Sequence, residues 1–262
     1  MTSFLNTEEK RISRDFENKG YIIRNVADQK SLKVIQNFFV KEIHRNIKIS
    51  KNLDNSTLLN SFHKMIKYNN LNVLRLKIIN SMEKNKDLRK LYYLAAKPFI
   101  ETIVGNELSM QLRINLSIQL PNDKSSLLSV HSDVWSGDSP FEVVAWIPLV
   151  DCYDTKTMYI LPPKKNKKFI LKKYKNSKTI FKSIYKDLIW PKVNFGQVLI
   201  FNQALPHGNV VNKENETRWS MNCRFKNVFT PYGDKKLGEF FEPITLRKAS
   251  QLGINYKSHK LK

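Results

Sequence analysis

The sequence predicts an α+β fold in which helices pack on one face of an antiparallel sheet. In residues 1–104, apolar side chains recur mainly at helical spacing. After Gly105 the pattern changes to strict alternation, which is typical of strands because successive side chains point to opposite faces of a sheet. Helices that come first and strands that follow, separated by turns, favour this architecture over an alternating parallel one.

Three helices and one short strand are expected in residues 1–104. The strand covers residues 20–24, and the first helix follows it with Asp28 and Ser31 as candidate caps. Pro98 should interrupt or kink the third helix, because proline lacks the backbone N–H. The apolar positions that mark the three helices are Leu32, Ile35, Phe38, Phe39 and Ile43, then Leu58, Leu59, Phe62, Met65 and Ile66, then Leu88, Leu91, Tyr92, Ala95 and Phe99.

Two strands after Gly105 have one wholly apolar face and one wholly polar face. The runs 143–147 and 198–201 are also strand-like. The helices need an apolar surface to cover, so we expect the apolar faces beneath them, while the polar faces line solvent or the interior of a barrel. The apolar positions are Leu112, Ile114, Leu116, Ile118 and Leu120 in the first strand and Trp219, Met221, Cys223 and Phe225 in the second; the polar ones are Arg113, Asn115, Ser117 and Gln119, and Arg218, Ser220, Asn222 and Arg224.

Length and composition fit one domain. The chain has 262 residues and is 41% hydrophobic, which suffices for a single sizeable core. We expect residues 1–104 to form a mainly helical cover and residues 105–230 a strand-rich core with a basic insertion at 164–190. Residues 231–262 would then be a C-terminal extension. No sequence feature specifies an oligomeric state.

Cysteine content and hydropathy exclude several protein classes. Cys152 and Cys223 are too few for a disulfide scaffold or a cysteine-rich zinc site, and they fit a reducing compartment. Residues 1–14 are polar and charged, unlike a signal peptide. No apolar run reaches the roughly 20 residues that span a bilayer. We therefore expect a soluble, cytoplasmic protein without a membrane span.

The chain is strongly basic, with a net charge of +22 from 45 Lys and Arg against 23 Asp and Glu. Such an excess is typical of proteins with an anionic partner, such as nucleic acid, a phosphorylated substrate or a membrane surface. We favour a compositional origin, because the chain is also rich in Asn and Ile, as AT-rich coding sequences are. Much of the excess lies in residues 164–186, at Lys164, Lys165, Lys167, Lys168, Lys172, Lys173, Lys175, Lys178, Lys182 and Lys186.

His131 and Asp133, with His207 far downstream, are candidate metal ligands. Two histidines and one carboxylate form the facial triad that holds Fe(II) in non-haem oxygenases and leaves the opposite face open. Residues i and i+2 of a strand share a face, so His131-x-Asp133 at a strand end would supply two ligands, and another strand must supply the third. His207 follows the run 198–201 and stands beside Gly208 in a predicted tight bend. The combination is far more specific than either motif alone.

Arg218 and Ser220 are candidate ligands of a dicarboxylate. 2-Oxoglutarate chelates iron through its 2-oxo acid end, so its distal carboxylate needs a separate, oriented partner. Arginine offers a planar two-pronged donor, and a serine hydroxyl two residues on lies on the same strand face. The other histidines are interpreted as structural or surface residues; they are His44, His63 and His259.

The chain resembles the phytanoyl-CoA dioxygenase-like branch of the Fe(II)/2-oxoglutarate oxygenases over most of its length. The motifs that carry the resemblance follow in family order: Phe16-Glu-Asn-Lys-Gly20-Tyr21-Ile22-Ile23, His131-x-Asp133, Ala145-Trp146-Ile147-Pro148-Leu149, Ile160-Leu161-Pro162-Pro163, Gly196-Gln197-Val198-Leu199-Ile200-Phe201, His207-Gly208-Asn209 and Arg218-Trp219-Ser220. The chain departs from the family where Pro163-Lys164-Lys165 replaces the frequent Gly-Ser-His and where Gln197 replaces a common acid.

The resemblance implies a double-stranded β-helix (jelly-roll) core with the N-terminal helices packed on its major sheet. It implies that His131, Asp133 and His207 bind Fe(II). Dioxygen and 2-oxoglutarate would be the cosubstrates. The residues implied around 2-oxoglutarate are Arg218, Ser220, Trp146 and Gln119. Within this branch the chain is similar to StrG-like oxygenases of bacterial carbohydrate and aminoglycoside clusters, partly through residues 241–256.

The expected activity is oxidation of a small substrate coupled to decarboxylation of 2-oxoglutarate to succinate. The presence of Asp133 argues against halogenation, which needs that position for halide; hydroxylation, desaturation and epimerisation stay open. Polar side chains beside an aromatic platform favour a saccharide or another polar or anionic molecule over a fatty acyl chain. The candidate substrate residues are Arg113, Asn115, Trp135, Asn222 and Arg224.

Two alternatives remain. Arg218 and Arg224 have the Arg-x5-Arg spacing used by nucleic-acid-demethylating oxygenases, and a basic chain would suit nucleic acid. We favour this less, because those enzymes lack such N-terminal helices and no basic strip is interleaved with base-stacking aromatics. The other alternative is a non-catalytic barrel that binds a carbohydrate or a partner, which the complete triad disfavours.

Overall fold

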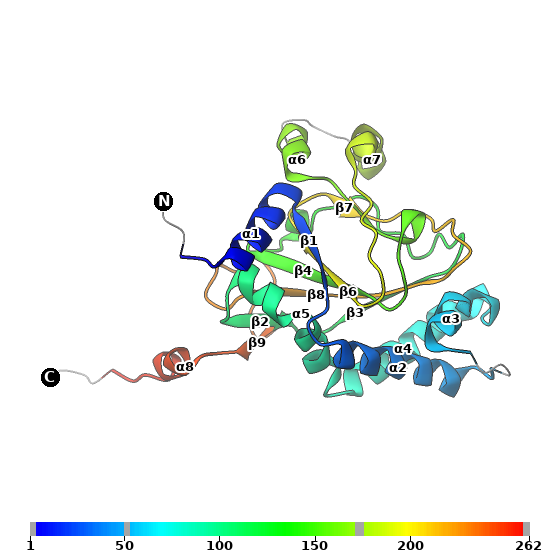
Figure 1. The fold of residues 1–262 in the computed structure, drawn as a ribbon, viewed down its shortest axis with the longest axis horizontal. Helices are drawn as coiled ribbons and strands as arrows, with labels where there is room; N and C mark the ends of the chain where they lie inside the picture. The colour runs from blue at the N-terminus through cyan, green and yellow to red at the C-terminus, as the bar shows by residue number, and fades with distance from the viewer. Residues whose placement is uncertain (1–3, 50–52, 171–175, 259–262) are drawn as a thin grey trace.

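A central antiparallel sheet organises the computed structural model, which describes residues 4–49, 53–170 and 176–258. Its strands follow the order β1–β6–β4–β8–β2–β9, and β3 also pairs with β8; a second, short sheet pairs β5 with β7 (Figure 1). The strands are β1 Tyr21–Asn25, β2 Leu108–Gln111, β3 Asn115–Gln119, β4 Glu142–Pro148, β5 Tyr159–Ile160, β6 Gln197–Asn202, β7 His207–Gly208, β8 Arg218–Asn227 and β9 Phe241–Thr245.

The N-terminal helices lie along one face of this sheet (Figure 1). They are α1 Thr7–Lys19, α2 Gln29–Asn46, α3 Asn55–Asn60, α4 Leu71–Lys84 and α5 Leu88–Val104, followed later by α6 Pro163–Ile170, α7 Ser177–Ile184 and α8 Lys248–Ile254. Short 3-10 turns occur at Phe62–Lys64, Tyr68–Asn70, Asp133–Ser136, Asp154–Lys156 and Tyr185–Asp187. No helix in the described ranges is long and apolar enough to cross a membrane.

Helix starts follow the predicted capping chemistry. The Asp28 side chain accepts the backbone N–H of Ser31 at 3.0 Å and caps α2, as expected. The interruption predicted at Pro98 is wrong, because α5 runs through it to Val104. The single helix predicted around Leu58 is also wrong: Leu58 and Leu59 lie in α3, Phe62 opens the following 3-10 turn, and Met65 and Ile66 lie beyond it.

The apolar face of β8 is covered by the helices, as the alternation predicted. Trp219 is fully buried; its ring contacts Phe39 and Phe62, and its indole N–H donates to the Leu59 carbonyl at 3.1 Å. Each aromatic ring removes a large apolar area from water, so these contacts supply much of the adhesion between helices and sheet. The opposite, polar face of β8 is thereby turned toward the second sheet.

The continuous strand predicted over residues 112–120 is broken in the structure. β2 and β3 are separate strands that pair with successive parts of β8, and the chain leaves the sheet between them. The side chain of Leu112 is exposed there, and its N–H bonds to the Phe240 carbonyl at 2.9 Å. The alternating sequence pattern could not show this break, because the period continues through it unchanged.

The basic insertion forms α6 and α7, which lie on the side of β7 (Figure 1). The apolar side of α7 packs inward, where Phe181 contacts Tyr159. The described lysines of the segment are exposed, which is typical of a solvated surface: Lys164, Lys165, Lys167, Lys168, Lys178, Lys182 and Lys186. Lys172, Lys173, Lys175 and also His259 lie outside the described residues.

Candidate metal centre

The three predicted metal ligands meet between the two sheets. His131 and His207 form an isolated antiparallel bridge, in which each backbone N–H donates to the other's carbonyl at 3.0 and 2.8 Å. Asp133 opens a 3-10 turn, Asp133–Ser136. The predicted location of His131-x-Asp133 at the end of a regular strand is therefore wrong. The bridge, rather than a shared strand face, brings the side chains together.

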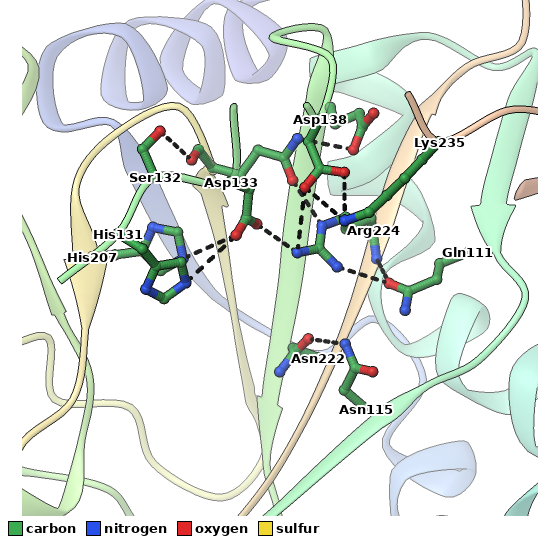
Figure 2. Close-up of polar contacts among 12 residues, drawn as sticks. Gln111, Asn115, His131, Ser132, Asp133, Asp138, His207, Asn222, Arg224 and Lys235 are labelled. Carbon is green, nitrogen blue, oxygen red and sulfur yellow. Dashed lines mark hydrogen bonds and ion pairs between the residues drawn. The ribbon is translucent and has the colours of Figure 1, made fainter. Parts of the chain in front are cut away.

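The ligand atoms converge on one point. The Asp133 Oδ1 atom lies 3.5 Å from His131 Nε2 and 3.9 Å from His207 Nε2 (Figure 2). One ligand atom from each residue lies within 4.8 Å of the others, which is close enough for all three to contact a single ion. Among the described residues, no other group of three histidine, cysteine or acidic side chains has its ligand atoms this close together.

Both histidines are oriented by backbone carbonyls. His131 Nδ1 lies 2.7 Å from the Ser129 carbonyl, and His207 Nδ1 lies 2.8 Å from the Leu205 carbonyl. A carbonyl only accepts, so Nδ1 carries the proton and Nε2 presents its lone pair toward Asp133. Metal-binding histidines characteristically donate their second ring N–H in this way. The donor set thus fits a divalent ion of the iron type.

His207 is held in a tightly enclosed position. Burial, reinforced by the neighbouring His131, lowers the pKa of His207 to about 4, so the ring is neutral at ordinary pH. A neutral imidazole is the form that binds metals. His207 belongs to the short strand β7, so the predicted bend lies before it rather than at it. Gly208 is required beside it, because a Cβ there would lie 2.7 Å from the Leu128 carbonyl oxygen.

A cavity of about 490 Å³ adjoins the three ligands. The four alternate residues of the polar face of β8 line it, as the expectation of a polar barrel interior requires. They are Arg218, Ser220, Asn222 and Arg224. Apolar side chains, including Trp146 and Phe201, line part of the remaining wall.

Arg218 and Ser220 present unused donors beside this cavity. Arg218 is buried, and its two terminal nitrogens donate to the Thr157 carbonyl at 3.4 Å and Ser117 Oγ at 3.0 Å. Within the described residues, Arg218 Nε and Ser220 Oγ have no hydrogen-bond partner. Buried polar atoms without partners are rare in folded proteins, so these two fit a carboxylate ligand at this end of the cavity.

The other two residues expected around the cosubstrate lie differently. Trp146 is buried on β4 and lines the cavity. Gln119 is opposite Arg218 in the β3–β8 pairing, donates to the Val210 carbonyl at 2.8 Å, and is not among the residues that line the cavity. Its Oε1 atom has no partner in the described residues.

The candidate substrate residues divide into two groups. Asn115 and Asn222 line the cavity and bond to each other, Nδ2 to Oδ1, at 2.8 Å (Figure 2). Arg113 does not reach the cavity: it lies in the break between β2 and β3, is 76% exposed and pairs with Glu83 at 3.1 Å. Trp135 is also outside the cavity lining, with its ring exposed. Arg113 lies away from the cavity because the strand that the alternation predicts over residues 112–120 is broken between β2 and β3.

Arg224 lines the cavity but is engaged with a proposed metal ligand. Its Nη2 atom lies 2.8 Å from Asp133 Oδ2, on the side of the carboxylate away from the histidines (Figure 2). Asp138 and Gln111 lie on its other side. Neither partner is predicted from the sequence. Asp138 follows Asp133 closely and had a visible signal as a second acid, whereas Gln111 had none.

Arg75 is a further cavity residue that the sequence did not indicate. It comes from α4, a helix that was not predicted, and pairs with the buried Asp123 at 3.2 Å. Its neighbour Ser126 lines the same wall. Because α4 has no strong capping signal and only a weak apolar stripe, sequence reasoning alone could not place this arginine.

No family model matches the sequence, and no curated protein matches it. Solved structures do. The non-haem monooxygenase ThoJ in complex with nickel aligns at a TM-score of 0.56 with 12% identity, over 93% of each chain. EctD from S. alaskensis, with 2-oxoglutarate and 5-hydroxyectoine, aligns at 0.57 with 12% identity, over 88% of this chain and 81% of EctD. The epimerase SnoN, in complex with Fe3+, α-ketoglutarate and nogalamycin RO, aligns at 0.53 with 14% identity, over 86% of each chain.

The chain therefore has the double-stranded β-helix fold of the non-haem, 2-oxoglutarate-dependent oxygenases, with N-terminal helices on its major sheet. This confirms the predicted fold. The likeness singles out no subfamily of these oxygenases. At such low identity the likeness establishes the fold alone. The evidence for the metal site is the geometry of His131, Asp133 and His207.

Proposed function

We propose that this protein is a non-haem oxygenase that uses Fe(II), 2-oxoglutarate and dioxygen to oxidise a small polar molecule. The observation that carries the proposal is the convergence of His131 Nε2, His207 Nε2 and Asp133 Oδ1 at the wall of a cavity. Beside that cavity, Arg218 Nε and Ser220 Oγ are buried donors that have no partner among the residues that the structure describes. Solved structures of the same fold support it, since SnoN is in complex with Fe3+ and α-ketoglutarate and EctD is solved with 2-oxoglutarate.

Each residue has a distinct part in this proposal. His131, Asp133 and His207 would hold the iron, with their Nε2 and Oδ1 atoms as ligands. Arg218 and Ser220 would bind the distal carboxylate of 2-oxoglutarate, and Trp146 would close the wall beside it. When bound, iron would activate dioxygen, the oxidant, and 2-oxoglutarate would supply two of the electrons as it is decarboxylated to succinate. The protein would bind and orient these molecules and exclude water.

The carboxylate of Asp133 bears on the reaction type. An iron-dependent halogenase needs room for halide where a carboxylate ligand would otherwise bind, so Asp133 argues against halogenation. Proteins of this fold include an enzyme described as an epimerase, SnoN, and one solved with 5-hydroxyectoine, EctD. Hydroxylation and epimerisation are therefore both within the range of this fold.

The substrate we favour is a saccharide or a sugar-derived metabolite, as in StrG-like oxygenases. The support is the pair Asn115 and Asn222 beside the cavity. Among the described residues, Asn115 Oδ1 and Asn222 Nδ2 are left without a hydrogen-bond partner. Vicinal hydroxyl groups suit such a donor and acceptor pair. A nucleic-acid substrate is less favoured, because Arg224 of the Arg-x5-Arg spacing is bound to Asp133 rather than free for phosphate.

Succinate release tests the proposed activity directly. We expect the protein to convert 2-oxoglutarate to succinate slowly in air when Fe(II) is present, and we expect His207→Ala to abolish this conversion. The matched control is His44→Ala, since His44 is exposed on α2, away from the site. A wild-type rate equal to that of the His207→Ala protein would contradict the proposal.

The substrate class is tested by stimulation of the same reaction. Panels of nucleotide sugars and aminoglycosides are compared with short single-stranded DNA and RNA. We expect a member of the sugar panel to increase succinate release. Stimulation by the nucleic acids alone would refute the saccharide assignment while leaving the oxygenase assignment intact.

A further inference from the structure

The two oxygens of the Asp133 carboxylate face different partners. Oδ1 faces His131 and His207, whereas Oδ2 lies 2.8 Å from Arg224 Nη2 (Figure 2). A carboxylate with free rotation presents either oxygen, or both, to an ion. The Arg224 contact removes this freedom and leaves Oδ1 as the atom directed toward the two imidazoles.

Arg224 is itself fixed by several contacts. Its Nε donates to Gln203 Oε1 at 3.0 Å, and its Nη1 lies 3.4 Å from Gln111 Oε1. The guanidinium also lies 5.9 Å from the ring centre of Phe240. Its side chain is 14% exposed, so solvent competes little for these bonds. A planar group held at several points is a rigid support for the carboxylate.

Gln203 links the backbone and the side chain of the metal-binding segment. Its carbonyl accepts the N–H of Asp133 at 3.1 Å and the hydroxyl of Ser132 at 3.3 Å. Its side-chain oxygen accepts from Arg224, and its side-chain nitrogen donates to Glu142 at 2.9 Å. Gln203, which directly follows β6, thus fixes both the position of the Asp133 backbone and the arginine that orients the Asp133 carboxylate.

The segment beyond β8 completes this network. Lys235 Nζ lies 2.7 Å from the Asp138 carboxylate, which in turn lies 3.9 Å from Arg224 (Figure 2). Asp234 donates its N–H to the Gly137 carbonyl at 2.8 Å. Asp133 and Asp138 balance the charges of Arg224 and Lys235, so the buried arginine is not an isolated charge.

We infer that Arg224 is a positioning residue that holds Asp133 as a one-oxygen ligand facing His131 and His207. The inference rests on the proposed function, since it assigns Arg224 a part in the same metal site. It replaces the sequence-based expectation that Arg224 contacts substrate. Arg224 acts through Asp133 and need not touch the ion.

A positioning role and a purely electrostatic role of Arg224 predict opposite effects of its removal on metal affinity. A positive charge beside Asp133 weakens the attraction of the site for a cation, so its removal would tighten metal binding if charge alone mattered. Loss of a group that orients a metal ligand instead weakens binding, typically by ~10- to 100-fold. The sign of the change therefore distinguishes the two roles.

The test is a titration of the full-length, metal-free protein with Mn(II), followed through the EPR signal of the free ion. The variants are Arg224→Met, which keeps the chain length and removes the charge, and Arg224→Lys, which keeps the charge without the two-pronged geometry. The matched control is Arg24→Met. Arg24 lies on β1, away from the site. Its side chain is 19% exposed, so it is similarly enclosed, and it pairs with Asp15 at 3.0 Å.

We expect Arg224→Met to weaken Mn(II) binding about 10- to 100-fold, Arg224→Lys to recover part of that loss, and Arg24→Met to bind like the wild type. Equal or tighter binding by Arg224→Met overturns the inference. If that variant does not fold, as judged by circular dichroism, a wild-type affinity of Arg224→Lys overturns it instead. A wild-type protein that binds no Mn(II) contradicts the proposed function, and the inference with it.

Discussion

His207 combines enclosure with a fixed tautomer. Its Nδ1 proton is bound to the Leu205 carbonyl, its ring packs against Phe201 at 4.9 Å between ring centres, and His131 lies on another side. Burial and the neighbouring imidazole both disfavour a second proton. The side chain is thus ready to bind a metal without first losing a proton.

This enclosure has a measurable consequence for stability in the metal-free protein. Burial lowers the pKa of His207 from its usual 6.5 to about 4. Between these values the unfolded chain binds a proton that the folded chain excludes, so the free energy of unfolding should fall as the pH falls from 6.5 to 4. Urea unfolding at several pH values in this range gives the free energy of unfolding as a function of pH. That free energy should change less steeply with pH in His207→Gln than in the wild type.

His44→Gln is the control for this pH series, because His44 is exposed on α2. Its slope should match that of the wild type. A His207→Gln protein with an unchanged pH slope would show that His207 titrates normally and is not enclosed as described.

Arg218 should contribute more to 2-oxoglutarate binding than Ser220. Hydrogen bonds to a charged group contribute about 1.5–3 kcal/mol, so Arg218→Met should weaken 2-oxoglutarate binding on the order of tenfold to a hundredfold. Ser220→Ala should weaken it by a few-fold. Anaerobic calorimetric titration of the Mn(II)-loaded protein measures both. If the wild type and Arg218→Met bind 2-oxoglutarate equally well, Arg218 is not part of the 2-oxoglutarate site.

β8 is the element that connects helices, sheet and cavity. Its odd-numbered residues from Trp219 to Phe225 pack under α2, α3 and α5, and its even-numbered residues from Arg218 to Arg224 line the cavity. Strict alternation in the sequence was enough to predict this, because a strand has one fixed geometry with two faces. The same rule put Asn115 and Asn222 on polar strand faces, but their pairing depends on the register between β3 and β8, which alternation does not give.

Other elements could not be predicted because tertiary contacts decide them. The break after β2 interrupts an unbroken alternation, and it carried Arg113 away from the cavity. The bridge between His131 and His207 depends on two segments distant in sequence. The contact of Asp138 with Lys235 joins two charged loop residues that have no periodic pattern, so local sequence gave no signal for it.

The contact between α2 and the sheet yields a prediction about stability. Phe39 is fully buried against Trp219, whereas Val34, on the same helix, is 52% exposed. Phe39→Ala should lower the free energy of unfolding by about 3–5 kcal/mol, and Val34→Ala should leave it nearly unchanged. Urea unfolding of both variants checks this. A small loss for Phe39→Ala would mean that α2 is not packed on β8 as described.

At the scale of the whole molecule, the net charge of +22 is not concentrated in the cavity. The cavity arginines Arg75, Arg218 and Arg224 are bonded to protein groups. The described lysines of α6 and α7 are exposed and lie outside the cavity lining. This distribution favours a solvated basic surface over a charged substrate channel.

Neutralising part of that surface should therefore leave catalysis unchanged. We expect a protein with Lys164, Lys165, Lys167 and Lys168 all changed to Gln to release succinate at the wild-type rate at both low and physiological salt. A marked loss that appears at low salt and vanishes at high salt would indicate an anionic partner on α6.

The central claim is that one site holds both Fe(II) and 2-oxoglutarate. The most direct measurement is the visible absorption spectrum of the anaerobic protein with Fe(II) and 2-oxoglutarate. Chelation of Fe(II) by the 2-oxo acid in the His131–Asp133–His207 site should produce a metal-to-ligand charge-transfer band that His207→Ala abolishes. A spectrum without this band at saturating Fe(II) and 2-oxoglutarate would contradict the account.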